Sequence, residues 1–324
     1  MDNLMKEISI QEIPGVFIGH AQDEEAKTGV SVIYFANGAQ GGCDISGGGP
    51  ASRETPLTDP LTADNPLNAV VLSGGSAYGL AASDGVMKCL EEHGVGYNTG
   101  YALVPLVCQS CIFDLGYGKN NVRPDASMGY EACKKALQGC DTSMGNVGAG
   151  TGASVGKLLG MKQAMKAGLG IHAIQVGDLK IAAVVVVNAF GDIFNPENGQ
   201  KVAGLVDPTR QTFLDLEQIF VSYFAAPRDM FNSNTTIGCI ITNAKFDKAK
   251  LNKIASMTRN AYARCINPVG TMADGDSIYA CSVGDVVSDV NLVGTLSAKV
   301  MQKAILKAVE AAKIPDEEYL LHCL

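Results

Sequence analysis

A polar run that leads straight into an apolar run is the feature that most constrains this chain of 324 residues. Residues 232–236 read Asn-Ser-Asn-Thr-Thr, and residues 237–241 read Ile-Gly-Cys-Ile-Ile, which predicts a buried strand. A hydroxyl at the start of such a strand can attack the peptide bond in front of it. Thr235 would then carry both a nucleophile and a free α-amine that titrates at about 8. An ordinary turn that enters a strand explains the same residues, since Asn and Ser favour turns and Thr favours strands.

The composition indicates a folded protein with a large core. Of the residues, 47% are hydrophobic, 18% are charged, and 37 are glycine. Few charges and many glycines are typical of a loop-rich α/β protein and not of a coiled coil or a disordered chain. The formal net charge is −8 and no stripe of Lys and Arg stands out, which argues against a nucleic-acid or anionic-membrane partner.

Nothing in the sequence predicts export or membrane insertion. Residues 1–7 are acidic without an apolar stretch, and the longest apolar run, residues 181–187, is too short to span a bilayer. Ten cysteines are scattered along the chain, so we expect reduced thiols and a cytoplasmic protein. Cys108 and Cys111 form one C-x-x-C pair with no second pair spaced for zinc, so we expect neither a metal nor another cofactor.

Short strands alternate with helices along the chain. The runs 168–176 and 180–187 predict a β-hairpin that turns at residues 177–178. A Gly-rich loop is expected at 41–50 and an exposed linker at 195–211. Together the elements indicate sheets packed face to face with helices outside, an α/β sandwich. Further strands are predicted at 30–35, 68–72, 102–113, 237–242 and 277–283, and helices at 80–93, 125–137, 215–224, 247–264 and 297–313.

Two Gly-rich segments resemble nucleotide-binding loops, but their context fails. Residues 148–153 match the loose pattern G-x-G-x-x-G/A, although no strand precedes them. Lys157 follows a glycine as at the end of a phosphate loop, but Thr151 and Leu158 stand where that motif needs Gly and Ser or Thr. Lys157 is therefore either a solvated residue at a helix start or a cation placed against a buried site.

Ser76 lies at a predicted strand-to-helix turn, where a nucleophile elbow would place it. The G-x-S-x-G spacing is incomplete, because Tyr78 stands in place of its last glycine. A serine hydrolase would also need a histidine base, and His172 lies inside an apolar run. A Ser76 triad remains an alternative reading.

Asp274 and Asp276 stand two residues apart before a predicted strand. They fit an ordinary Asp-Gly turn, a loose metal loop, or a pair that orients a nucleophile. Two close carboxylates raise one another's pKa unless a cation balances them, and Lys157 is available for that role. Asn188, at the end of a buried run, adds an amide donor.

Six motifs in order resemble the L-aminopeptidase/D-esterase and β-aminopeptidase family, which includes the nylon-oligomer amide hydrolases. The resemblance covers nearly the whole chain. It is carried by residues 13–20, 48–55, 71–80, 112–115, 148–153 and 234–238, of which the block Val-Leu-Ser-Gly-Gly-Ser-Ala-Tyr-Gly-Leu at 71–80 is the most distinctive.

The resemblance implies a four-layer αββα sandwich, like that of N-terminal-nucleophile hydrolases, and a single domain over 1–324. It implies self-cleavage between Asn234 and Thr235 into fragments 1–234 and 235–324, which stay together and assemble as a homo-oligomer. Thr235 would be the nucleophile that cleaves peptide or small amide substrates. Asp274 and Asp276 would match the acidic pair of the family, and Lys157 and Asn188 its Lys and Asn, with Asn188 as an oxyanion donor.

Two departures from the family pattern bear on the activity. Aminopeptidase members carry Ser-Gly-Glu where this chain has Asp-Gly-Asp at 274–276, which favours the amide-hydrolase branch. Members carry Tyr where Phe113 aligns, so that hydroxyl is missing. Thr236 is the rival nucleophile. The alternatives to self-processing are a Ser76 hydrolase and a non-catalytic or acyl-transferring relative of the same fold.

Overall fold

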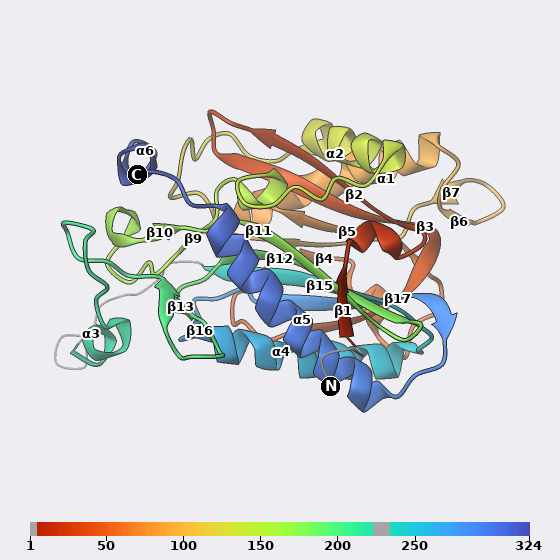
Figure 1. The fold of residues 1–324 in the computed structure, drawn as a ribbon. Coiled ribbons are helices and arrows are strands. Elements are labelled where there is room, and N and C mark those ends of the chain that lie inside the picture. Colours follow the sequence, from red (N-terminus) through yellow and green to blue (C-terminus); the bar gives the residue numbers. More distant parts are fainter. Residues whose placement is uncertain (1–4, 223–233) are drawn as a thin grey trace.

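Ten paired strands form the centre of the protein, and helices lie on both sides of them (Figure 1). The computed structural model describes residues 5–222 and 234–324. The strand order is β1-β11-β12-β15-β17-β3-β5-β8-β4, and β2 pairs with β3 beside this path. These strands are β1 (Met5–Ile8), β2 (Val16–Asp23), β3 (Thr28–Ile45), β4 (Ser52–Arg53), β5 (Leu67–Ser73), β8 (Val107–Cys111), β11 (Leu169–Val176), β12 (Leu179–Asn188), β15 (Thr235–Ala244) and β17 (Ser277–Val286).

Strand β3 belongs to two sheets. Its first part, residues 28–35, pairs with β2 and β5, and its second part, residues 40–45, pairs with β17. The first sheet contains β1, β11, β12, β15 and β17, and the second contains β2, β5, β8 and β4. Because one strand continues from sheet to sheet, the two sheets fold over one another with a shared apolar interior.

The side chains of β12 show how the layers are built. Ile181, Ala183 and Val185 pack with residues of α4 (Lys248–Cys265) and α5 (Val290–Ala311). Their neighbours Ala182, Val184 and Val186 face the second sheet, because successive side chains of a strand point to opposite faces. The outer face of the second sheet is covered by α1 (Ala82–Glu92) and α2 (Ala126–Gln138). The protein is therefore a four-layer αββα sandwich, as predicted.

The remaining elements are short, and those that Figure 1 labels lie at the edges of this sandwich. They are the strands β6 (Tyr97–Asn98), β7 (Leu103–Val104), β9 (Ser154–Val155), β10 (Met165–Lys166), β13 (Asp192–Phe194), β14 (Lys201–Ala203) and β16 (Ile266–Asn267), the helices α3 (Leu216–Ser222) and α6 (Asp316–Leu320), and short 3₁₀ helices at Ile10–Glu12, Thr55–Thr58, Ser76–Ala81, Gly148–Gly150 and Met161–Gln163. No helix in residues 5–222 and 234–324 is long and apolar enough to cross a membrane.

Most predicted elements are confirmed, and their local signals explain them. The predicted hairpin is the antiparallel pair β11 and β12. The carboxylates of Asp125 and Asp247 accept backbone N–H bonds at the starts of α2 and α4. Helix α5 begins earlier than predicted, because Asp289 caps it in the same way. The end of the predicted helix 215–224, at 223–224, and the motif residues 231–233 lie outside the described residues.

The Gly-rich loop predicted at 41–50 is wrong in its first part. Gly41 and Gly42 lie inside β3, which continues to Ile45. A Cβ at Gly42 would lie 2.3 Å from the backbone nitrogen of Asn252 in α4. The glycine therefore serves close packing of a helix on a strand and not a turn.

The exposed linker predicted at 195–211 is also wrong in part. Residues 201–203 form β14, which pairs with β13. Leu205 and Val206 are buried, and the Asp192 carboxylate accepts a hydrogen bond of 2.7 Å from the backbone N–H of Leu205. Leu205 also packs with Leu158 and Phe190. Polar and Gly-rich composition concealed this apolar anchor.

Candidate active site

Thr235 and Asn188 lie opposite one another at the end of the space between the two sheets. Thr235 is the first residue of β15, and it pairs in antiparallel register with Asn188, the last residue of β12. Directly opposite residues of an antiparallel pair point to the same face. Ile237 and Val186, two residues along each strand, face the second sheet, so Thr235 and Asn188 point into the interior as well. Both are buried.

The peptide bond before Thr235 is held on both sides. The backbone N–H of Asn234 donates to the carbonyl of Ala273 at 2.8 Å. The carbonyl of Asn234 accepts the backbone N–H of Gly275 at 2.7 Å, and it also accepts the hydroxyl of Thr235. A hydroxyl and a backbone N–H thus converge on one buried carbonyl oxygen.

The Asp276 carboxylate binds the backbone next to this peptide bond, and the Asp274 carboxylate binds the neighbouring loop. Asp276 Oδ1 accepts the N–H of Thr236 at 2.6 Å, and its Oδ2 accepts the N–H of Gly270 at 3.0 Å. Asp274 Oδ2 accepts both the N–H and the hydroxyl of Thr271, at 2.9 and 2.7 Å. Burial and the neighbouring Asp274 carboxylate raise the pKa of Asp276 to about 7, while its two backbone donors oppose the rise.

Lys157 is buried in the same region as Asp274 and Asp276. The interpretation of Lys157 as a solvated residue at a helix start is therefore wrong, and its placement against a buried site is confirmed. Its Nζ donates to Asn188 Oδ1 at 2.7 Å and to the Asn188 carbonyl at 3.1 Å. Burial lowers the pKa of Lys157 to about 7, and the carboxylates of Asp274 and Asp114 limit the fall. Burial thus lowers the pKa of an amine and raises the pKa of a carboxyl within one site.

The Asn188 side chain connects three segments of the chain. Its Oδ1 accepts Lys157 Nζ and, at 3.1 Å, the N–H of Ser154, while its Nδ2 donates to the Phe113 carbonyl at 2.8 Å. One N–H of the amide is used in this way. The hydrogen bond from Asn188 Nδ2 goes to the backbone carbonyl of Phe113. It therefore does not depend on the tyrosine hydroxyl that position 113 lacks.

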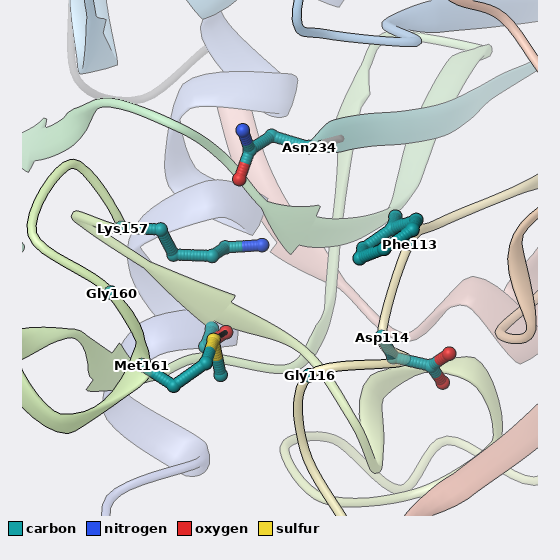
Figure 2. A pocket seen from close by; sticks show the side chains of 8 residues that line it. Phe113, Asp114, Gly116, Lys157, Gly160, Met161 and Asn234 are labelled. Atoms are coloured by element: carbon teal, nitrogen blue, oxygen red, sulfur yellow. Dashed lines mark hydrogen bonds between the residues drawn. The ribbon is translucent and has the colours of Figure 1, made fainter. Parts of the chain in front are cut away.

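A small pocket opens next to these residues. It has a volume of 90 Å³, and Figure 2 shows the Lys157 side chain reaching into it between Asn234 and Met161. The pocket and the peptide bond of Asn234 and Thr235 are thus parts of one site. The pocket is lined by Phe113, Asp114, Gly116, Ser154, Lys157, Gly160, Met161 and Asn234.

Sequence reasoning missed two residues of the site. Gly275 supplies the backbone donor to Asn234, and its place between the two aspartates was the available signal. Asp114 is fully buried, and its carboxylate accepts the hydroxyl of Thr28 at 2.6 Å and the N–H of Gly75 at 2.7 Å. Burial raises the pKa of Asp114, while these bonds and Lys157 oppose the rise.

The rival residues are placed differently. Thr236 points to the opposite face of β15, where its Oγ1 is buried without a hydrogen-bond partner in the described part of the chain. Ser76 has a left-handed φ of 54°. All four histidines lie in the described residues, and each has a contact with a residue other than Ser76. His20 contacts Ser31, His93 contacts Cys89, His172 contacts Glu7, and His322 contacts Tyr117.

The thiols of Cys108 and Cys111 contact different groups. Both thiols are buried; Cys108 Sγ lies 3.2 Å from the carbonyl of Glu54, and Cys111 Sγ lies 3.0 Å from Ser73 Oγ. Within residues 5–222 and 234–324, no three His, Cys, Asp or Glu side chains gather as metal ligands.

The buried Lys157 predicts a pH-dependent stability. The pKa of Lys157 is 10.5 in the unfolded chain and about 7 in the folded one. As the pH falls from 10.5 to about 7, the Lys157 amine therefore gains a proton in the unfolded chain only. Stability is therefore lost as the pH falls from 10.5 to about 7. Lys166 is shifted in the same direction, whereas Asp276 titrates in the folded chain at about 7 and below 7 in the unfolded one. We expect Lys157→Met to reduce the rise in urea midpoint between pH ~7 and ~10.

The parent chain and its lysine variants all carry Thr235→Ala in this measurement, so that each is one intact polypeptide. Lys162, an exposed lysine in the same region, provides the control Lys162→Met, which should keep the full pH dependence. An equal rise in midpoint for the Lys157→Met and Lys162→Met chains would contradict the assignment.

Comparison with known proteins places the chain among amide-bond hydrolases. The model of peptidase family S58 matches residues 9–316. An uncharacterized aminopeptidase of Mycobacterium tuberculosis is 36% identical, in an alignment that covers 93% of this chain and 93% of that protein. A 6-aminohexanoate-oligomer endohydrolase of Kocuria sp. is 31% identical over 317 residues, which span 92% of this chain and 85% of that protein. The resemblance seen in the sequence is confirmed.

Solved structures confirm the fold. The L-aminopeptidase D-Ala-esterase/amidase of Ochrobactrum anthropi, a variant of the Ntn-hydrolase fold, superposes with a TM-score of 0.68 at 16% identity, over 94% of this chain and 86% of that one. A β-aminopeptidase of Burkholderia sp. superposes with a TM-score of 0.65 at 17% identity, over 93% of this chain and 85% of that one. The αββα sandwich described above is shared with these structures.

Proposed function

Because this chain belongs to peptidase family S58 and is therefore a hydrolase of peptide or amide bonds, we propose that it activates itself by cutting between Asn234 and Thr235. One observation carries the proposal. The carbonyl of Asn234 accepts both the hydroxyl of Thr235 and the N–H of Gly275 in a buried site. These contacts support the proposal, because a hydroxyl and an N–H that could hold the developing oxyanion both lie at this carbonyl.

In the first step, Thr235 Oγ1 attacks the carbonyl carbon of Asn234. The hydroxyl proton passes to the Thr235 nitrogen as the C–N bond breaks, which leaves an ester and a free α-amine. Water then adds to the ester carbonyl, and the C–O bond breaks. The products are a carboxylate at Asn234 and a Thr235 with its hydroxyl restored.

In turnover, the α-amine of Thr235 takes the proton of its own hydroxyl as Oγ1 attacks a substrate amide. The N–H of Gly275 and the second amide N–H of Asn188 are the proposed oxyanion donors. The substrate amine leaves with the proton, and water hydrolyses the acyl-enzyme. Lys157 orients Asn188. Asp276 holds the N–H of Thr236, directly after the nucleophile, and Asp274 holds the neighbouring loop at Thr271.

The two fragments of the proposed cut share one sheet. Strand β15, in fragment 235–324, lies between β12 of fragment 1–234 and β17. Separating the fragments would break both the ladder with β12 and the pairing of β17 with β3. We therefore propose that they stay together as one domain. The family resemblance leads us to propose a homo-oligomer of this unit, and the scattered cysteines lead us to propose that it acts in the cytoplasm.

The proposed substrates are peptides or small amides. The relatives are named as an aminopeptidase and as an endohydrolase of 6-aminohexanoate oligomers. Activity assays should therefore include both peptides and amide oligomers as substrates. The Asp-Gly-Asp sequence at 274–276 favours simple amides over β-aminopeptides. The small pocket next to Asn234 suits a short acyl group.

Intact-mass spectrometry of the purified protein tests the proposal. Dividing 33.8 kDa in the ratio of 234 to 90 residues predicts species of about 24 and about 9 kDa, the smaller one beginning at Thr235. A single species at 33.8 kDa together with amide turnover would overturn self-processing and favour Ser76 as nucleophile. A single species without turnover would favour a binding protein or an acyltransferase, and an added amine acceptor distinguishes these two.

A further inference from the structure

The uncut chain shows where a substrate acyl group must lie. If Thr235 is the nucleophile in both reactions, then the carbonyl it attacks in a substrate must occupy the place that the Asn234 carbonyl holds now. The part of the substrate on the acyl side therefore takes the place of Asn234. Figure 2 shows the Asn234 side chain at the rim of the pocket, so the pocket continues the acyl side of the site. This inference rests on the proposed function.

Met161 lines the pocket on the side of Lys157 away from Asn234. Its side chain points into the pocket from the far side of the Lys157 ammonium (Figure 2), and its Sδ lies 3.9 Å from Ser154 Oγ. The adjoining wall at Gly116 has no side chain. The volume of 90 Å³ is small beside the ~300 to 1,000 Å³ of typical ligand pockets. Met161 is therefore the side chain whose size limits how far an acyl group can extend.

The backbone of Met161 is fixed by a segment far away in the sequence. The hydroxyl of Tyr319 donates to the Met161 carbonyl at 3.0 Å, and the Cys323 thiol donates to the same oxygen at 3.6 Å. The N–H of Leu324 donates to the carbonyl of Gly116 at 3.1 Å. Tyr319 is buried and stacks on Tyr117 with ring centroids 5.1 Å apart. One segment thus holds both pocket walls, at Gly116 and at Met161.

We propose that Met161 is the end wall of the acyl pocket and restricts the enzyme to substrates with short acyl groups, and that Tyr319 is the positioning residue that holds this wall. A thioether fits this role because it fills irregular space and is polarizable. In the processed protein, Tyr319 belongs to the small fragment and Met161 to the large one. The pocket wall would then depend on the two fragments staying together.

The test compares substrates that differ only in length. The p-nitroanilides of alanine, aminobutyrate and norleucine are assayed with the unmodified protein and with Met161→Ala. We expect the ratio of kcat/KM for norleucine to that for alanine to rise at least about tenfold in the variant, since one methylene in an apolar pocket changes the specificity by ~10 to 200-fold. Met165→Ala is the matched control. Met165 packs against the apolar cluster between the first sheet and helices α4 and α5, and it does not line the pocket.

Tyr319→Phe separates positioning from simple stability. It removes one hydrogen bond to the Met161 carbonyl and keeps the stacked ring, so we expect a smaller rise of the same ratio and no further rise in the double variant with Met161→Ala. Met161→Val still shortens the side chain but leaves a smaller gap than alanine does, and it serves if Met161→Ala does not fold. An unchanged ratio in processed, active Met161 variants would overturn the inference, whereas an uncut unmodified chain would overturn the proposed function.

Discussion

Thr235→Ala is expected to give an uncut chain of 33.8 kDa with no measurable amide hydrolysis. The substitution removes the hydroxyl that contacts the Asn234 carbonyl, so neither the ester nor the new α-amine can form. Intact mass reports the processing, and p-nitroanilide turnover reports the activity. The fold should persist, because Thr235 makes its main ladder contacts through the backbone opposite Asn188.

Two variants make this result specific to the hydroxyl of Thr235. Thr235→Ser keeps a hydroxyl at the same place and should still be cut. Thr236→Val removes the rival hydroxyl, whose Oγ1 has no partner among the described residues, and should be cut as completely as the unmodified chain. Processing of the Thr235→Ala chain, or loss of processing in Thr236→Val, would contradict the assignment.

Gly275→Ala is expected to slow self-cleavage by about 10² to 10³, the usual effect of losing one oxyanion donor. The Cβ of an alanine would lie 2.8 Å from Thr235 Oγ1 and 2.8 Å from the Gly49 carbonyl, so the backbone at 275 must move. That movement misaligns its N–H, which now donates to the Asn234 carbonyl at 2.7 Å. The fraction of uncut chain, followed over time by intact mass, measures the effect.

Gly49→Ala is the matched control for this substitution. Gly49 lies across the same site, but the nearest atoms to its Cβ position are 3.8 Å away, which is ordinary contact. Its N–H donates to the Asp274 carbonyl and remains after the change. We expect normal cleavage in Gly49→Ala. Equal slowing in both variants would mean that Gly275 acts through general packing and not through its N–H.

The parts of the fold that the sequence predicted have short-range causes. The hairpin of β11 and β12 follows from two apolar runs around Gly177, and α4 begins where the Asp247 carboxylate can cap it. The errors come from long-range packing. Gly42 was assigned to a loop because glycine breaks regular structure, yet it lies in β3 where α4 approaches closely. The four layers were predicted from the family resemblance and not from the element pattern alone.

The candidate site divides in the same way. Thr235, Asp274, Asp276, Lys157 and Asn188 were proposed from sequence, and the structure places them around one buried peptide bond, although their roles stay predictions. What the residue types did not indicate is which atoms meet. The carboxylates bond to backbone N–H groups and Thr271, and the amide of Asn188 bonds to Lys157, Ser154 and Phe113.

The sequence by itself indicated the candidate cut site, because a hydroxyl at the first position of a predicted buried strand is a local pattern. Only the tertiary structure decided that the Asn234 carbonyl meets Gly275, that Lys157 is buried against Asn188, and that Tyr319 holds Met161. These contacts join residues far apart in the chain. Their partners are set by strand register and by the packing of distant segments, which no local pattern of residues encodes.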